Sequence, residues 1–106
     1  MPFLKLKELQ TKAPFAGFTV RFVHSATMTF AHWDIEAGAV LPPHSHPHEQ
    51  VANVIAGEFE LTIAGETQRL GPSSVGIIPS HAVHSGRAVT RCHIIDAFYP
   101  IREDYR

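Results

Sequence analysis

From residue 18 onward the chain consists of short apolar runs that are separated by turn residues. The runs are rich in Val, Ile, Phe and Thr and are interrupted by Gly and Pro, a pattern typical of β-strands. In the run Phe59–Ile63 apolar and polar residues alternate, which predicts an antiparallel strand with one buried face. The sequence predicts nine strands: Phe18–His24, Met28–Ile35, Ala39–Leu41, Gln50–Ala56, Glu58–Ile63, Thr67–Leu70, Val75–Ile78, His84–Ala88 and Arg91–Phe98.

Many short strands at even spacing predict an all-β fold, either an antiparallel sandwich or a barrel. The 106 residues, with a mass of 11.7 kDa, suit a single domain spanning 1–106. Within it we expect an N-terminal arm at 1–17, a barrel at 18–98 and a C-terminal tail at 99–106. Helical periodicity is nearly absent, and the short stretch Leu4–Leu9 fits a strand or an arm equally well.

The composition narrows the class of partner. With 44% hydrophobic and 18% charged residues, the chain is expected to fold rather than stay disordered. A net charge of −1 without a basic run excludes nucleic acid and an anionic membrane as main partners. The single Cys92 allows no internal disulfide, and no segment resembles a signal peptide or a membrane span. We therefore expect a cytoplasmic protein.

Five of the eight histidines lie between His44 and His84. His44 and His46 are two positions apart, so in a strand they would project from one face, where two imidazoles can share a metal ion. One such pair is more often a surface feature. A second half-site, Pro79 followed five positions later by His84 in an apolar stretch, makes one divalent metal ion per chain the favoured interpretation.

Two residues compete for the fourth ligand position. If Gln50 points inward, the side chains that share its face are small (Ala52, Val54 and Ala56) and leave room for a cavity. If Glu49 points inward, its companions are bulkier, so we favour Gln50. Three neutral imidazoles and an amide oxygen would leave the full charge on the ion, and these ligands suit Ni, Zn, Fe or Mn.

The other histidines have weaker claims on the metal. His48 is expected at the rim of the site, and His81 competes with His84 for the third ligand position, although the spacing from Pro79 favours His84. The remaining three are expected on the surface or on a sheet face: His24, His32 and His93.

An acidic residue interrupts the last apolar strand. Asp96 shares a face with Ile94 and Phe98, and a carboxylate inside a small barrel must be paired, bound or functional. If that face is the interior, Asp96 and Phe98 line the cavity and Arg102 folds over its mouth. The alternative is an edge strand with Asp96 in water and Arg102 in a loose tail, and the composition favours neither.

The spacing of these residues resembles the two motifs of the cupin superfamily. Gly38-x5-His44-x-His46-x3-Gln50-x6-Gly57 corresponds to the first motif, with Gln50 at the usual Glu position. Pro79-x4-His84 corresponds to the end of the second, although His81 stands where Gly is usual and the usual Asn after the last His is missing. The resemblance implies a small double-stranded β-helix (jelly-roll) barrel, often a homodimer.

Residues 44–50 and 96–104 resemble more narrowly the KdgF-type cupins of pectin and alginate breakdown. That family converts cyclic 4,5-unsaturated uronate monomers to linear 4-deoxy-5-keto uronates, which implies a small sugar acid as partner and isomerase- or lyase-like ring-opening chemistry. The resemblance implies metal ligands at His44, His46, Gln50 and His84, and active-site residues at Asp96, Phe98 and Arg102. A cupin-type metal-dependent dioxygenase and a non-catalytic small-molecule-binding cupin are the alternatives.

Overall fold

The computed structural model describes residues 3–106, which form ten strands and two short 3-10 turns. The strands are β1 (Lys12–Phe15), β2 (Phe18–His24), β3 (Thr29–Ile35), β4 (Val40–His44), β5 (Glu49–Ala56), β6 (Phe59–Ile63), β7 (Glu66–Leu70), β8 (Val75–Ile78), β9 (His84–Ala88) and β10 (Cys92–Tyr99). The turns are η1 (Leu6–Glu8) and η2 (Glu103–Tyr105). Among these residues, no helix has the length and apolar character needed to cross a membrane.

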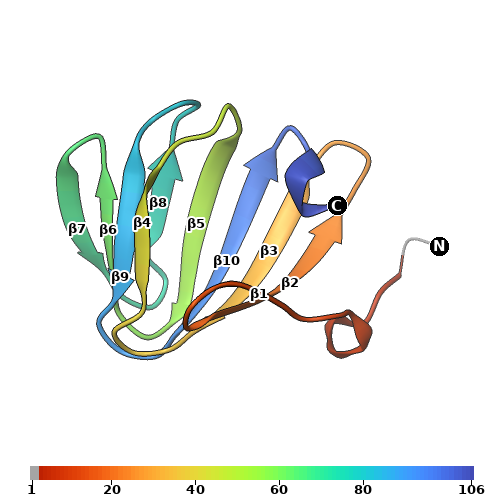
Figure 1. Ribbon diagram of the computed structural model, residues 1–106, viewed down its shortest axis with the longest axis horizontal. Coiled ribbons are helices and arrows are strands. Elements are labelled where there is room, and N and C mark those ends of the chain that lie inside the picture. The colour runs from red at the N-terminus through yellow and green to blue at the C-terminus, as the bar shows by residue number, and fades with distance from the viewer. Residues whose placement is uncertain (1–2) are drawn as a thin grey trace.

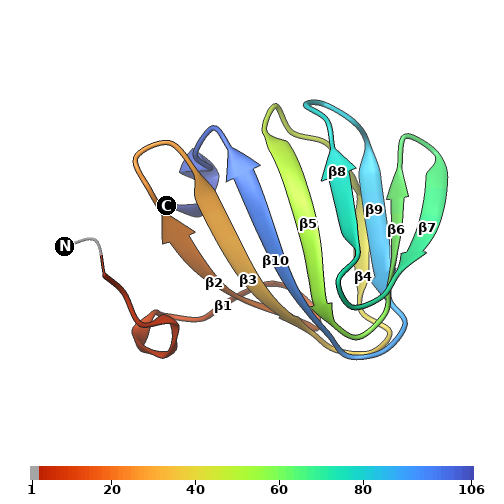
Figure 2. The same cartoon turned by 180° about the vertical axis from the view of Figure 1, so that it is seen from behind.

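Two antiparallel sheets face each other. The larger has the strand order β1-β2-β3-β10-β5-β8 and the smaller β4-β9-β6-β7, and Figures 1 and 2 show them from opposite sides. Side chains from both inner faces form one core, to which the larger sheet contributes Trp33 and Val54 and the smaller Phe59 and Leu61. The all-β jelly-roll fold expected from the sequence is confirmed.

Two edge strands differ from the predicted pattern. β1 lies within the expected N-terminal arm, of which residues 1 and 2 lie outside the described part, and pairs with β2 despite containing Pro14. β4 runs through Pro42 and Pro43 to His44, whereas the sequence predicted a strand ending at Leu41. Both strands lie at sheet edges, where the N–H group that proline lacks is not needed for a hydrogen bond to a neighbouring strand. Proline therefore marked turns less reliably than expected.

The residues after β10 pack into the barrel mouth. Tyr99 is the last residue of β10, so the strand extends one position into the predicted tail. Arg102 is buried, and its backbone N–H donates to Thr29 Oγ1 at 2.9 Å. η2 follows directly. The loose-tail alternative for Arg102 is therefore wrong, because this segment is held between the ends of β3 and β10.

Gly57, the last residue of the first cupin-like motif, makes the turn from β5 to β6 possible. Its φ of +85° is accessible to glycine at little cost, and a Cβ there would collide with the carbonyl oxygen of Arg91. The absent side chain lets the chain pass close to the start of β10. β5 and β10, the two strands that carry Gln50 and Asp96, can therefore pair along most of their length.

Candidate active site

One cavity between the two sheets brings together all seven residues that were singled out as metal ligands or active-site residues. They are His44, His46, Gln50, His84, Asp96, Phe98 and Arg102. Apolar side chains from both sheets line the rest of the wall, together with Tyr105 from η2. Polar groups thus converge at one end of a largely apolar cavity, as is typical of small-molecule sites.

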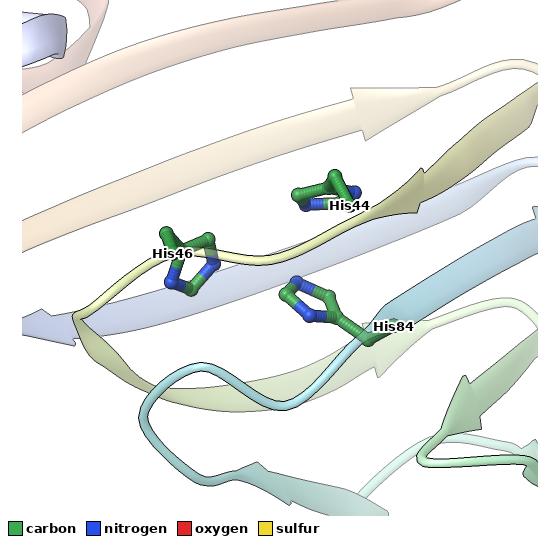
Figure 3. A group of neighbouring side chains, drawn as sticks. All are labelled: His44, His46 and His84. Carbon is green, nitrogen blue, oxygen red and sulfur yellow. The ribbon is translucent and has the colours of Figure 1, made fainter.

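The three predicted histidine ligands form a cluster although they come from separate segments. β4 pairs with β9 so that His44 lies opposite His84, and their ring centroids are 4.1 Å apart. His46 lies in the loop after β4, not on the same strand as His44, and its ring centroid is 4.8 Å from that of His84. One ligand nitrogen from each ring lies within 4.8 Å of the other two, and Figure 3 shows the rings turned toward one another.

Backbone carbonyl groups orient all three rings in the same way. The Nδ1 atoms of His44, His46 and His84 lie 2.8, 3.0 and 2.9 Å from the carbonyl oxygens of Pro42, His48 and Ala82. A carbonyl oxygen only accepts hydrogen bonds, so each Nδ1 carries the proton and donates it. Each Nε2 is then left with a free lone pair, which is the tautomer that binds metal ions.

The surroundings of these Nε2 lone pairs suit a bound cation. His84 Nε2 is buried and has no hydrogen-bond partner within residues 3–106. His46 Nε2 lies 3.1 Å from Gln50 Oε1, so two acceptor atoms face one another. Buried acceptors without a donor are costly, and a shared cation satisfies all of them. The arrangement therefore fits a divalent metal ion.

The imidazoles of His46 and His84 are neutral in this environment. Burial, followed by the charge of Arg102 and the proximity of His84, lowers the pKa of His46 to about 4. Burial also lowers the pKa of His84. Because a metal ion competes with protons for the same lone pair, the lowered pKa values keep these two rings ready to bind it at neutral pH.

Gln50, not Glu49, faces the cavity. On β5 the side chains of Gln50, Ala52 and Val54 are buried, whereas that of Glu49 is exposed. The expected alternation fails only at Ala56, which is exposed because the register between β5 and β10 shifts at that end. The alternation of side chains along the strand therefore predicted the orientation of Gln50 correctly.

Asp96 lies beside Gln50 on the neighbouring strand. It is 7% exposed, and its Oδ1 is buried with no hydrogen-bond partner in the described chain. Burial raises the pKa of Asp96 to about 7, although side-chain hydrogen bonds with Gln50 and Trp33 and the charge of Arg102 oppose the rise. Because Gln50 Oε1 lies toward His46 and a carboxylate only accepts, the Gln50 amide nitrogen is the group that can donate to Asp96.

Arg102 completes the polar end of the cavity. The guanidinium carbon lies 4.8 Å from the centroid of the Phe98 ring and 4.2 Å from that of Tyr105. The Phe98 ring is also 5.7 Å from the ring of His46, so it lies near both the arginine and the histidine cluster. A fixed cation and the candidate metal ligands therefore both lie close to Phe98.

The competing histidines lie outside the cluster. His81 is exposed with a φ of +66°, and its backbone N–H donates to His46 O at 2.8 Å, so it holds the loop rather than the metal. His48 is partly buried next to His46, at the rim as expected, with a ring-centroid distance of 5.6 Å. His24, His32 and His93 lie on the larger sheet, away from the cluster.

Sequence reasoning missed Tyr105 and Asp104, which both contact Arg102. They follow Arg102, the last of the three candidate active-site residues, in a segment that is polar enough to suggest a tail. The one available signal was Tyr105 itself, a large aromatic residue among charged neighbours.

Comparison with known proteins agrees with this geometry. The Cupin_2 family (cupin domain) matches residues 31–98. The pectin degradation protein KdgF of Dickeya dadantii (strain 3937) is 34% identical over 70 residues, which cover 64% of this chain and 64% of that protein, less than two thirds of either. The structure of KdgF from Halomonas sp. has a TM-score of 0.93 and 28% identity, covering 100% of this chain and 99% of that one.

An RmlC-like cupin from Shewanella frigidimarina NCIMB 400 superposes equally well, with a TM-score of 0.94, 24% identity and coverage of 100% and 96%, which supports the fold. The resemblance to KdgF-type cupins that the sequence suggested is thus confirmed by both a sequence relative and a solved structure. With the family match extending over well over half of the chain, this protein belongs to the Cupin_2 family.

Proposed function

We propose that the protein is a metal-dependent enzyme that converts cyclic 4,5-unsaturated uronate monomers to linear 4-deoxy-5-keto uronates. The observation that carries this proposal is the shared cavity, which joins three metal-ready imidazoles to a buried carboxyl group and a fixed guanidinium. The likeness to two KdgF proteins, one of them named as a pectin degradation protein, supports a sugar acid as substrate.

Four side chains would hold the metal ion. They are His44, His46 and His84 through Nε2, and Gln50 through its amide oxygen. Nitrogen and oxygen ligands of this kind suit Ni, Zn, Fe or Mn. A divalent ion in this position supplies Lewis-acid charge that stabilises an oxygen anion on the substrate.

Asp96 is the proposed proton carrier. In the reaction its carboxylate takes the proton of the hemiacetal hydroxyl group, and the O–H electron pair forms the C=O bond of an aldehyde. The bond between that carbon and the ring oxygen breaks at the same time, and its electron pair leaves with the ring oxygen as an enolate. The protonated Asp96 then returns the proton to C4, the carbon end of the enolate, which yields the ketone at C5, so that the conversion is an isomerisation with no net gain or loss of atoms. A buried carboxyl beside the histidine cluster is well placed for both transfers.

Arg102 is the proposed anchor for the substrate carboxylate. Its guanidinium is held against two aromatic rings at the cavity wall, and a charge-assisted bidentate pair would orient the sugar. Phe98, whose ring lies near both this anchor and the histidine cluster, would pack on the apolar face of the sugar ring and exclude water.

Arg102→Ala is expected to raise KM, because the anchor acts in the ground state and the transition state alike. The loss of a bidentate charged pair should lower kcat/KM by about 30- to 1000-fold. Steady-state kinetics on the metal-loaded protein measure the change. Arg87→Ala, which removes an exposed arginine paired with Glu60, is the control and should leave KM unchanged. A normal KM for Arg102→Ala would exclude Arg102 as the anchor.

The proposed function is tested directly by incubating the metal-loaded protein with 4,5-unsaturated uronate monomers. Loss of the absorbance of the double bond, with a linear 5-keto product in the NMR spectrum, is the expected result. Oxygen consumption with candidate diketones or flavonols would point instead to the dioxygenase alternative. Tight binding of the uronate without turnover would identify a binding protein.

We also propose a homodimer. The outer face around the edge strand β8 exposes large apolar side chains, among them Ile55, Val75 and Ile77. The segment before β1 exposes Leu4 and Leu6 and extends away from the barrel in both views (Figures 1 and 2). Burial of these surfaces against a second copy removes apolar area from water. Light scattering at micromolar concentration should therefore give twice the chain mass of 11.7 kDa, and a monomer mass would contradict the dimer.

The cytoplasmic location of the protein stays a prediction.

A further inference from the structure

Arg102 is held on one side by Asp104, two positions further along the chain. Its Nε and Nη2 donate to the two carboxylate oxygens of Asp104 at 3.0 and 2.7 Å. The arginine side chain is 8% exposed and that of Asp104 is 57% exposed, so the pair bridges the cavity wall and the surface. The hydrogen bond from Arg102 lowers the pKa of Asp104, and the carboxylate is therefore charged at neutral pH.

Two aromatic rings restrict the same guanidinium. Phe98 and Tyr105 both lie within 5 Å of its central carbon. Tyr105 is itself fixed, because its ring stacks on Phe22 with a centroid distance of 4.3 Å and its carbonyl oxygen accepts from His24 Nε2 at 3.3 Å. The rings thus limit where the guanidinium plane lies.

The rings do not determine how the guanidinium is rotated within its own plane. The two hydrogen bonds to Asp104 do, because they engage one specific edge of the planar fork. They use two of the five N–H groups, and the Nη1 end takes no part in this contact. Arg102 lines the cavity, and its contact with Asp104 leaves three N–H groups for a second carboxylate.

We propose that Asp104 is a positioning residue that fixes Arg102 so that its Nη1 end receives the carboxylate of the substrate. The inference rests on the proposed role of Arg102 as carboxylate anchor and adds the residue that orients it. Without Asp104 the guanidinium would be free to rotate and would stay buried as an unpaired cation, so each binding event would have to order it anew.

Asp104→Ala is expected to raise KM for the 4,5-unsaturated uronate by about five- to thirtyfold while kcat stays within about twofold. Asp104→Glu keeps the carboxylate and should recover part of the loss. Glu103→Ala removes an adjacent, exposed carboxylate that pairs with Arg106, and it should leave both parameters unchanged. With the methyl ester of the same uronate, which lacks the charge that Arg102 recognises, Asp104→Ala should have no effect on KM.

A second readout does not depend on turnover. In the 15N–1H spectrum of the arginine side chains, Arg102 Nε–H should give a slowly exchanging signal in the wild type and in Glu103→Ala. That signal should be lost in Asp104→Ala. If the wild type consumes no unsaturated uronate, the proposed function fails, and the spectrum still shows whether Asp104 holds Arg102.

Two results would overturn the inference. A lower KM in Asp104→Ala would mean that Asp104 competes with the substrate for Arg102 instead of orienting it. An unchanged KM, or an Arg102 signal that persists in Asp104→Ala, would mean that the two aromatic rings are sufficient to position the guanidinium.

Discussion

Replacing His84 by alanine is expected to strip the protein of most of its metal, which in the wild type should amount to about one divalent ion per chain. His84 is 1% exposed, and its Nε2 has no other partner in the described chain, so no neighbouring group can take its place. His46→Ala should behave alike. Because altering a residue that merely supports a ligand costs 10- to 100-fold in affinity, the loss of a direct ligand should cost at least about a hundredfold. Metal analysis of the purified variants measures it.

The controls for this experiment come from the neighbouring residues. His81→Asn removes the competing histidine and suits the left-handed backbone there, so metal content should not change. Gln50→Ala should weaken binding less than either histidine variant, because an amide is the poorer ligand. Glu49→Ala should have no effect, since the side chain points away from the cavity. Full metal retention in both histidine variants, or metal loss in Glu49→Ala, would contradict the proposed ligand set.

Asp96→Asn is expected to lower kcat by about a hundred- to ten-thousandfold, the usual contribution of general acid–base catalysis. Asparagine has nearly the same shape but cannot carry the proton from the hemiacetal oxygen to the ring carbon. KM should change little, because Arg102 is left to hold the substrate carboxylate. Stopped-flow or steady-state assays of double-bond loss measure the effect.

The fold and the metal content of Asp96→Asn must be shown to be unchanged, because Asp96 contacts the proposed ligand Gln50. Asp34→Asn, which alters an exposed carboxylate on β3, is the matched control and should turn over normally. Normal turnover by metal-loaded Asp96→Asn would show that Asp96 is structural, and the ring-opening mechanism would then lack its proton carrier.

Local sequence patterns were sufficient for much of the fold and the candidate site. Apolar runs between glycines and prolines predicted nine of the ten strands, because side-chain alternation and turn chemistry act over a few residues. The same alternation distinguished Gln50 from Glu49 and placed Asp96 on one face with Phe98, and both pairs have that orientation in the structure. Where the pattern depends on position in a sheet, it failed: Pro14 and the pair Pro42-Pro43 lie in strands because those strands are at the edges.

Only the tertiary structure decided which distant groups meet. The sequence left open whether Asp96 faces the interior or water, since an alternating strand has the same pattern in an edge and a centre position. The smaller sheet packs over the face of β10 that carries Asp96, and this packing buries that face. Likewise, no local pattern shows that β4 and β9 pair with His44 opposite His84, or that backbone carbonyls turn each Nε2 toward one point. Arg102 lies among Phe98, Tyr105 and Asp104 because the C-terminal segment packs against β2 and β3. These contacts join residues that are far apart in the chain, so they leave no periodic pattern in the sequence.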